Sequence, residues 1–288
     1  MTLTELRSVL SARLDDQVAL AWVLEEVLAA SRSELAVQSG REVTDEELRI
    51  AGALVDEVVA GVPLQHVLGH WSFRTIELSV DRRALIPRPE TEVVVGVALD
   101  ELARLATFRP SPLRCLDLGT GSGAIALSLV SECPDVRVVA TDASTEALAL
   151  AGENRSQLPE PLRSRVELRH GDWYGALVAD EESAAVLPFD LICANPPYLS
   201  EAEWRQVEPV VRDYDPVQAL VAGPNGAEQI AIVVAGAREH LVGGGALVVE
   251  IGSLQGPAAK RLATSSGAGD VMVLPDLVGR DRVLLARF

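Results

Sequence analysis

Residues 1–60 show the spacing of apolar side chains that is typical of helices. Leucines and valines recur three or four positions apart in two runs, which cover 6–14 and 18–28. This spacing places them on one face of a helix. A third helix is predicted to begin at Thr44, because this residue can cap a helix whose first turn carries three acidic side chains. The pattern therefore predicts a small helical domain.

The pattern changes beyond this helical part. Polar and apolar residues alternate over 73–80 and predict a strand, which could form one half of a hairpin. Pro87 and Pro89 then indicate the start of a helix, with Pro89 near its first position and Glu90 and Glu92 in its first turn. This segment is expected to connect the helical domain to the rest of the chain.

From residue 86 onward, short apolar strands alternate with helical segments. The predicted strands are 113–118, 136–141, 166–169, 189–194, 246–251, 270–274 and 282–286. Such alternation is typical of an α/β fold with a parallel sheet and helices on both faces. We expect the fourth strand to lie beside the first and the last two to form a hairpin around Gly279. Residues 178–185 are predicted to form a loop, to which no role is assigned.

Composition agrees with a globular enzyme. The chain has 288 residues, of which 48% are hydrophobic and only 4% aromatic, so we expect an aliphatic core. There is no apolar run of about eighteen residues and no basic segment before an apolar one at the start, which favours a cytoplasmic protein. Cys115 and Cys193 fall in predicted strands as core thiols. His66 and His70 are separated by Gly69, which interrupts a helix, so no metal site is expected.

Net charge bears on the choice of partner. The formal charge is -17 at pH 7, and such a surface repels phosphate groups. We therefore expect no nucleic-acid partner. An acidic enzyme can bind a basic protein, although acidity can also serve only to keep a protein in solution.

A glycine-rich loop joins the first predicted strand of the sheet to a helix. It consists of Gly119, Thr120, Gly121, Ser122 and Gly123. Glycine lets a ligand approach the backbone closely, and the free N–H groups at the start of a helix face that ligand. The loop alone suits dinucleotides, S-adenosylmethionine or a plain tight turn.

Residues at the ends of the next two strands narrow the choice of ligand. Asp142 lies roughly twenty residues beyond the glycines, where an acidic side chain can accept hydrogen bonds from both ribose hydroxyls. Asp172 could accept from an adenine amino group, and Trp173 could cover the ring. Two other roles remain open, since Asp142 could cap a helix and Trp173 could be a core aromatic residue.

Asn195, Pro196, Pro197 and Tyr198 directly follow the fourth predicted strand of the sheet. A planar NH2 group conjugated to a carbonyl or a ring offers mainly N–H donors, so an enzyme that alkylates it needs acceptors. The Asn195 side-chain oxygen and the Pro196 carbonyl provide two acceptors, and the prolines stiffen the loop that holds them. Tyr198 adds a flat apolar face. A rigid turn without chemistry is the alternative.

These motifs carry a family resemblance. The segment 116–123 with Asp142 resembles the S-adenosylmethionine site of class I methyltransferases, and 195–198 resembles the amino-methylating signature of that fold. The segments 63–69, 85–92, 214–220 and 279–282 resemble the bacterial release factor glutamine methyltransferase (PrmC/HemK) family. Three departures from its pattern are Asp215, in place of a longer acidic residue, Ala222, in place of glycine, and Asn225, in place of aspartate.

The resemblance implies a fold, a cofactor and a substrate. It implies a Rossmann-like, seven-stranded class I methyltransferase domain over 86–288, a linker with a hairpin over 71–85 and a helical docking domain over 1–70. The cofactor is S-adenosyl-L-methionine, converted to S-adenosyl-L-homocysteine. The substrate is the glutamine of the Gly-Gly-Gln motif in class I peptide chain release factors, which act in translation termination. We expect a monomer.

The resemblance also assigns site residues. The cofactor-binding set is Gly119, Thr120, Gly121, Ser122, Gly123, Asp142, Asp172, Trp173 and Asn195. Substrate binding is assigned to Asn195, Pro196, Pro197 and Tyr198, of which Asn195, Pro196 and Tyr198 are the catalytic residues. Arg88 and Glu90 either shape the cofactor pocket or form a local ion pair.

Two alternatives remain. The same chemistry could act on a glutamine of a ribosomal protein or on the exocyclic amine of a base. A cofactor-binding interaction protein without catalysis is the other class, against which the intact segment 195–198 argues.

Overall fold

The computed structural model describes residues 1–177 and 188–288, so the loop predicted over 178–185 lies outside the described residues. The chain divides into two compact units, Met1–His70 and Trp71–Phe288. Across the described ranges, none of the helices is both long enough and apolar enough to cross a membrane.

The first unit is built from helices. They are α1 (Leu3–Ser11), α2 (Gln17–Leu28), α3 (Arg32–Val37), α4 (Asp45–Val59) and α5 (Leu64–Leu68). Thr44 caps α4 in a reciprocal pair with Glu47, as its sequence predicts. Ser31 and Glu34 form the same capping box at α3. That helix was not predicted, because six residues are too few for an apolar repeat to show. The apolar faces of these helices form one common core.

A hairpin of β1 (His70–Phe73) and β2 (Ile76–Ser79) starts at the last residue of the first unit and otherwise belongs to the second. The strand predicted over 73–80 is confirmed as one half of a hairpin, although it begins at Ile76 and not at Phe73. The chain turns at Arg74, whose φ is 51° in the left-handed region that non-glycine residues rarely adopt. The Arg74 guanidinium donates to both carboxylate oxygens of Glu132, at 2.6 and 2.7 Å, and these long-range bonds hold the turn.

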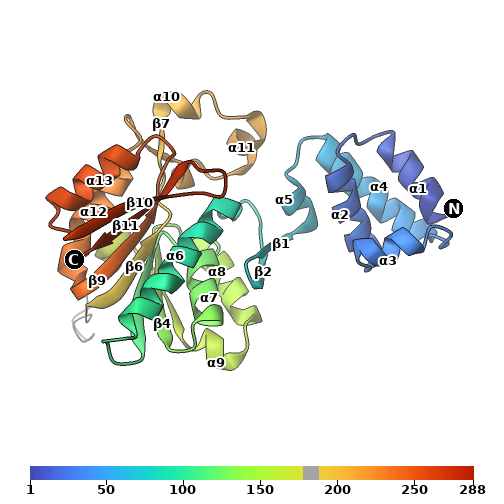
Figure 1. Ribbon diagram of the computed structural model, residues 1–288. Helices are drawn as coiled ribbons and strands as arrows, with labels where there is room; N and C mark the ends of the chain where they lie inside the picture. Colours follow the sequence, from blue (N-terminus) through green and yellow to red (C-terminus); the bar gives the residue numbers. More distant parts are fainter. Residues whose placement is uncertain (178–187) are drawn as a thin grey trace. The chain divides into compact units, whose positions relative to one another are not determined.

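The main sheet has seven strands in the order β10-β11-β9-β6-β3-β4-β5 (Figure 1). Its strands are β3 (Leu113–Leu118), β4 (Val136–Asp142), β5 (Val166–His170), β6 (Phe189–Ala194), β9 (Leu241–Glu250), β10 (Asp270–Pro275) and β11 (Asp281–Arg287). The α/β class is confirmed, and β6 pairs parallel with β3 as expected. The last two strands form the predicted antiparallel hairpin, with Gly279 in its turn.

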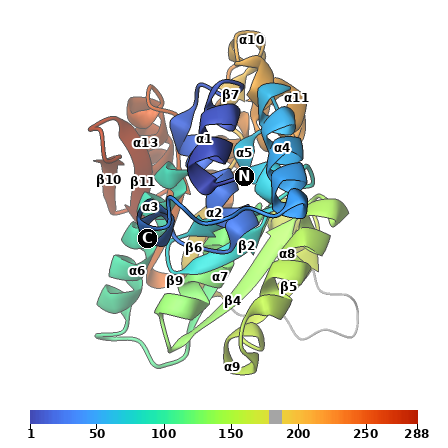
Figure 2. The ribbon, with the colours of Figure 1, turned by 90° about the vertical axis from the view of Figure 1, so that its right-hand side faces the viewer.

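Helices cover both faces of this sheet (Figures 1 and 2). On one face lie α6 (Pro89–Leu105) and α7 (Ala124–Glu132), and on the other lie α12 (Glu228–His240) and α13 (Gly256–Ser265). Successive residues of a strand point to opposite faces, so the Cys115 side chain enters the first core and the Leu116 side chain the second. Two further helices, α8 (Thr145–Gln157) and α9 (Glu160–Arg163), follow β4.

Short elements lie near the carboxyl ends of the central strands. They are η1 (Trp173–Leu177), β7 (Leu199–Ser200), α10 (Glu201–Trp204), α11 (Pro209–Tyr214), η2 (Val217–Ala219) and β8 (Val221–Gly223). The strands β7 and β8 pair in parallel as a separate small sheet. Parallel α/β sheets bind their ligands at this edge, so these elements and the strand ends define where a site is expected.

Candidate active site

A cavity of about 700 Å³ opens at the carboxyl ends of β3, β4 and β6. Nine of the predicted site residues line it, namely Gly119, Thr120, Gly121, Ser122, Asp142, Asp172, Trp173, Asn195 and Pro197. Arg88 also lines it. Gly123, Pro196 and Tyr198 are not among the lining residues. The fold thus gathers the two predicted motifs, which lie more than seventy positions apart in the chain, around one space.

The conformation of the loop from β3 to α7 depends on glycine. Gly119, Gly121 and Gly123 have φ values of 72°, 57° and 88°, which other residues adopt only with strain. Gly123 is the N-cap of α7, and a Cβ there would lie 3.0 Å from the Leu127 side chain. Conformation and packing, and not only close approach of a ligand, therefore require these glycines.

Asp117, near the end of β3, anchors this loop and was not predicted as a site residue. Its side chain is fully buried and accepts hydrogen bonds from the Thr120 hydroxyl at 2.6 Å and the Ala126 N–H at 3.2 Å. Burial raises the pKa of the Asp117 carboxyl to about 7, against the lowering effect of these two bonds. The signal in the sequence was an acidic residue between two leucines of a predicted buried strand.

The Asp142 carboxylate is held from both sides at the end of β4. Its Oδ2 accepts from the Gly121 N–H at 2.9 Å, and its Oδ1 accepts from the Ser144 N–H at 2.8 Å. Ser144, not Asp142, is the N-cap of α8. Each carboxylate oxygen keeps a further lone pair, so Asp142 can accept two hydroxyl groups from the cavity that it lines.

Trp173 takes part both in the cavity and in the core. Its ring lies against the glycine loop, since a Cβ on Gly119 would be 3.5 Å from the ring. The indole N–H donates to the Gln229 side-chain oxygen at 2.9 Å, which fixes the ring plane. The residue also packs at the border of the second core, so the two roles open for it in the sequence are compatible. Asp172 lines the cavity beside it.

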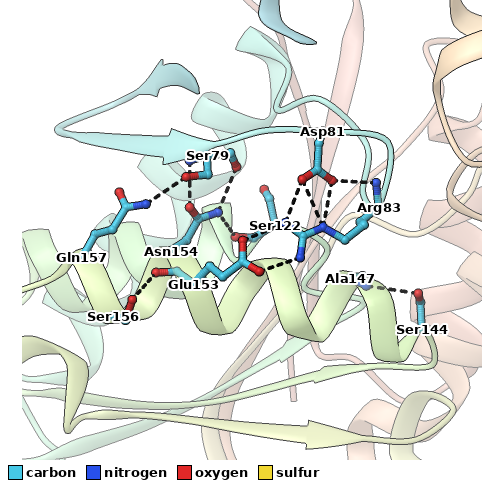
Figure 3. Close-up of polar contacts among 10 residues, drawn as sticks. All are labelled: Ser79, Asp81, Arg83, Ser122, Ser144, Ala147, Glu153, Asn154, Ser156 and Gln157. Atoms are coloured by element: carbon cyan, nitrogen blue, oxygen red, sulfur yellow. Dashed lines mark hydrogen bonds and ion pairs between the residues drawn. The ribbon is translucent and has the colours of Figure 1, made fainter. Parts of the chain in front are cut away.

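Asn154 on α8 ties the glycine loop to the hairpin (Figure 3). Its NH2 group donates to the Ser79 carbonyl at 3.1 Å and the Ser122 carbonyl at 2.9 Å, while its oxygen accepts from the Ser79 N–H at 2.7 Å. Only 2% of Asn154 is exposed. Arg83 joins Asp81 to Glu153 in the same region (Figure 3). None of this network was predicted, because its partners are far apart in the chain.

The segment 195–198 follows β6 directly. Asn195 is half-buried and donates from Nδ2 to the Thr91 hydroxyl oxygen at 3.2 Å. The carbonyl of Tyr198 accepts from Gln255 at 3.0 Å, which holds the end of the segment. Burial, and secondly the charge of Glu250, raise the pKa of the Tyr198 hydroxyl, so it stays protonated at neutral pH. Thr91 and Glu250 are contacts that the sequence did not reveal.

Arg88 and Glu90 pair with distant residues, and not with each other. The Arg88 guanidinium contacts the Asp215 carboxylate at 2.6 Å, and Glu90 lies 3.6 Å from Arg280. Asp215 is the shorter acidic residue noted above, and it is buried under this contact. Arg82 lies over the neighbouring Tyr214 ring at 4.4 Å. The segments 85–92 and 214–220 are thereby joined beside the cavity.

In the part of the chain that the structure describes, no cluster of three or more His, Cys, Asp or Glu side chains has the geometry of a metal site. Its three cysteines are free thiols.

Models of two known families match separate parts of this chain. The model of the PrmC N-terminal domain matches residues 2–69, and that of the Methyltransferase small domain matches 102–211. The release factor glutamine methyltransferase of Rhodopirellula baltica is 36% identical over 95% of this chain and 88% of its own length. The release factor glutamine methyltransferase of Deinococcus radiodurans is 39% identical over 92% of this chain and 88% of its own length.

A solved structure supports the fold alone. The catalytic domain of hMettl16, crystallised with MAT2A 3'UTR hairpin 6, superimposes with a TM-score of 0.55 at 16% identity. The match covers 86% of this chain and 84% of that one.

Proposed function

Because this chain belongs to the release factor glutamine methyltransferase family, we propose that it methylates the side-chain amide nitrogen (N5) of a glutamine in peptide chain release factors. The proposed methyl donor is S-adenosyl-L-methionine, and the proposed target is the Gly-Gly-Gln motif of class I release factors. The observation that carries the proposal is Asn195, whose amide lines the same cavity as the glycine loop and Asp142.

The residues around the cavity fit this cofactor. A volume of about 700 Å³ lies within the roughly 300–1,000 Å³ typical of ligand pockets. Asp142 has lone pairs available for two ribose hydroxyls, and the Trp173 ring offers a face for adenine. Gly119 and Gly121 expose backbone beside them. We propose that these residues, with Asp172 and the rest of the loop, hold the cofactor.

We propose that Asn195 and Pro196 bind the substrate amide. When bound, the cofactor supplies an electrophilic methyl group on a sulfonium sulfur, so the rate depends chiefly on alignment. The Asn195 oxygen and the Pro196 carbonyl accept the two N–H groups of the amide and direct its nitrogen lone pair toward the donor side. Tyr198 packs on the amide plane. A strong base is not required, because the nitrogen proton becomes acidic once nitrogen is alkylated.

The helical unit Met1–His70 is proposed to dock the release factor. Its match to the PrmC N-terminal domain supports this role, and the net negative charge of the chain suits a partner with exposed arginines. The catalytic domain is proposed to span 86–288, after the linker of 71–85.

The direct test is methyl transfer from labelled S-adenosylmethionine. The enzyme is incubated separately with a class I release factor, with ribosomes and with nucleic acid, and mass spectrometry locates the methyl group. We expect label on the Gly-Gly-Gln glutamine of the release factor. Label on a ribosomal protein, or only on nucleic acid, would contradict the proposed substrate.

A further inference from the structure

Asn195 is the first member of a series of hydrogen bonds that runs through Thr91, which also lines the cavity, to Glu250, which does not. Its Nδ2 donates to Thr91 Oγ1 at 3.2 Å, and the Thr91 hydroxyl donates to Glu250 Oε2 at 2.7 Å. Thr91 lies in the first turn of α6, and Glu250 is the last residue of β9. Only 4% of Thr91 and 1% of Glu250 are exposed, so solvent does not compete for these bonds.

The number of protons on each group determines which atom donates and which accepts in these two hydrogen bonds. A carboxylate can only accept, and a hydroxyl has a single proton to donate. When the proton of Thr91 points to Glu250, the lone pairs of its oxygen face Asn195. Lone pairs bind the NH2 end of an amide and not its oxygen. The Asn195 side chain is therefore oriented with Nδ2 toward Thr91 and Oδ1 available on the opposite side.

We propose that Thr91 and Glu250 are positioning residues that orient the Asn195 amide so that its oxygen, and not its NH2 group, meets the substrate amide. This inference rests on the proposed function, in which Asn195 must accept a hydrogen bond from the glutamine NH2 group. If the Asn195 amide were reversed, its NH2 group would face the NH2 group of the substrate glutamine, and two donors cannot bond to each other. The reversed orientation would therefore bind the substrate poorly and would not direct the lone pair of the glutamine nitrogen.

The surroundings of Glu250 make this orientation sensitive to pH. Burial raises the pKa of its carboxyl to about 7, while the bond from Thr91 lowers it. The charged side chains that act on it are Arg282 on β11 and Arg88, which lower its pKa, and Glu90, which raises it. The charge of Glu250 in turn raises the pKa of the nearby Tyr198 hydroxyl.

Protonation of Glu250 removes the constraint on direction. A neutral carboxyl can donate its own proton to Thr91 Oγ1, and the Thr91 proton is then free to bond to the Asn195 oxygen. The reversed amide becomes competitive, so kcat should fall as pH decreases through about 7.

The test uses the full-length enzyme with three single variants. Thr91→Val keeps the side-chain shape but removes the hydroxyl, and kcat should fall about tenfold or more, equivalent to about 1.4 kcal/mol in the barrier. Glu250→Gln should lower kcat and remove the pH dependence near neutrality. Thr91→Ser keeps the hydroxyl and should restore most of the rate. Combining Thr91→Val with Glu250→Gln is expected to give an enzyme no slower than Thr91→Val alone, because Thr91→Val already removes the hydrogen bonds that connect Asn195 to Glu250.

Affinity for S-adenosylhomocysteine is measured by calorimetry. Glu250→Gln should keep the wild-type affinity, because Glu250 does not line the cavity, and this separates orientation from misfolding. A wild-type kcat in Thr91→Val, or a wild-type pH profile in Glu250→Gln, would overturn the proposal.

A readout without turnover tests the Thr91–Glu250 link independently. The pH dependence of unfolding is compared between wild type and Glu250→Gln, and between Thr91→Val with and without Glu250→Gln. The bond from Thr91 lowers the pKa of Glu250. Its loss should therefore move the pH range over which Glu250 changes the free energy of unfolding to higher pH. If this range does not move, the link between Thr91 and Glu250 is refuted. If the wild type fails to methylate release factors while this shift occurs, the proposed function fails but the hydrogen-bond chain stands.

Discussion

The carboxyl of Asp117 gives a quantitative prediction about stability. Burial raises its pKa from the usual 3.8 to about 7, so the folded protein retains a proton that the unfolded chain releases. A raised pKa contributes stability that is fully present below about pH 4 and is lost as pH rises through about 7. A difference of about three pKa units corresponds to about 4 kcal/mol, because each unit is worth about 1.4 kcal/mol.

Asp117→Asn isolates this contribution. Asparagine resembles the neutral acid, and its oxygen can accept the same bonds from Thr120 and Ala126. At pH 5 the variant should already be more stable than the wild type by about 1.6 kcal/mol, because pH 5 lies about 1.2 units above the usual pKa of 3.8, so the unfolded wild type has released a proton that the folded protein keeps. At pH 8 it should be more stable, by up to about 4 kcal/mol, because only the wild type must ionise a buried group.

The assay is urea unfolding followed by circular dichroism from pH 5 to pH 8. The difference between variant and wild type is the informative quantity, since the contribution of Glu250, whose pKa is also raised to about 7, is common to both proteins and cancels. A difference that does not change with pH, or that favours the wild type at pH 8, would refute the reasoning about burial.

Three further substitutions test the site. Asn195→Ala removes the proposed acceptor and should lower kcat by about 100-fold or more, with cofactor affinity nearly unchanged; normal turnover by the radiolabel assay would exclude the role. Asp142→Ala removes the proposed ribose acceptor and the partner of the Gly121 N–H, so cofactor affinity should weaken by about 2 kcal/mol in calorimetry. Equal affinity in both proteins would place the ribose elsewhere. Asn154→Ala leaves buried groups of Ser79 and Ser122 unpaired, and thermal unfolding should show a loss of about 1–3 kcal/mol, whereas Gln157→Ala, on the exposed end of the same network, serves as the control with little change.

Local patterns predicted the frame of the fold well. The strand 113–118 is found at the predicted residues as β3, and the cap at Thr44 forms as its sequence indicates. These features depend on neighbours within a few positions, so the sequence displays them directly. The strand predicted over 73–80 is found at Ile76–Ser79, and only its start was wrong. Alternation extends back through Arg74, where bonds to the distant Glu132 hold a turn.

The two motifs that surround the cavity were also local in sequence. The glycine loop and the segment 195–198 each follow an apolar strand, and parallel pairing of β3 with β6 brings them to the same edge. The family resemblance then indicated which residues to assign to cofactor and substrate. The bond between Thr120 and Asp117 lies within the first motif, whereas other contacts that support the two motifs come from residues outside them.

Local sequence patterns were therefore enough to specify the class of fold, the succession of strands in the main sheet and the identity of the motifs, because short-range periodicity, capping and turn chemistry depend on nearby residues. How the motifs are held depends on the packing of the folded chain. Asn154 on α8 donates a hydrogen bond to the glycine loop, and Asp215 forms an ion pair with Arg88. Asn195 donates to Thr91, which donates in turn to Glu250. These partners lie far apart in the chain, and a hydrogen bond or ion pair between them depends on packing that no local pattern encodes.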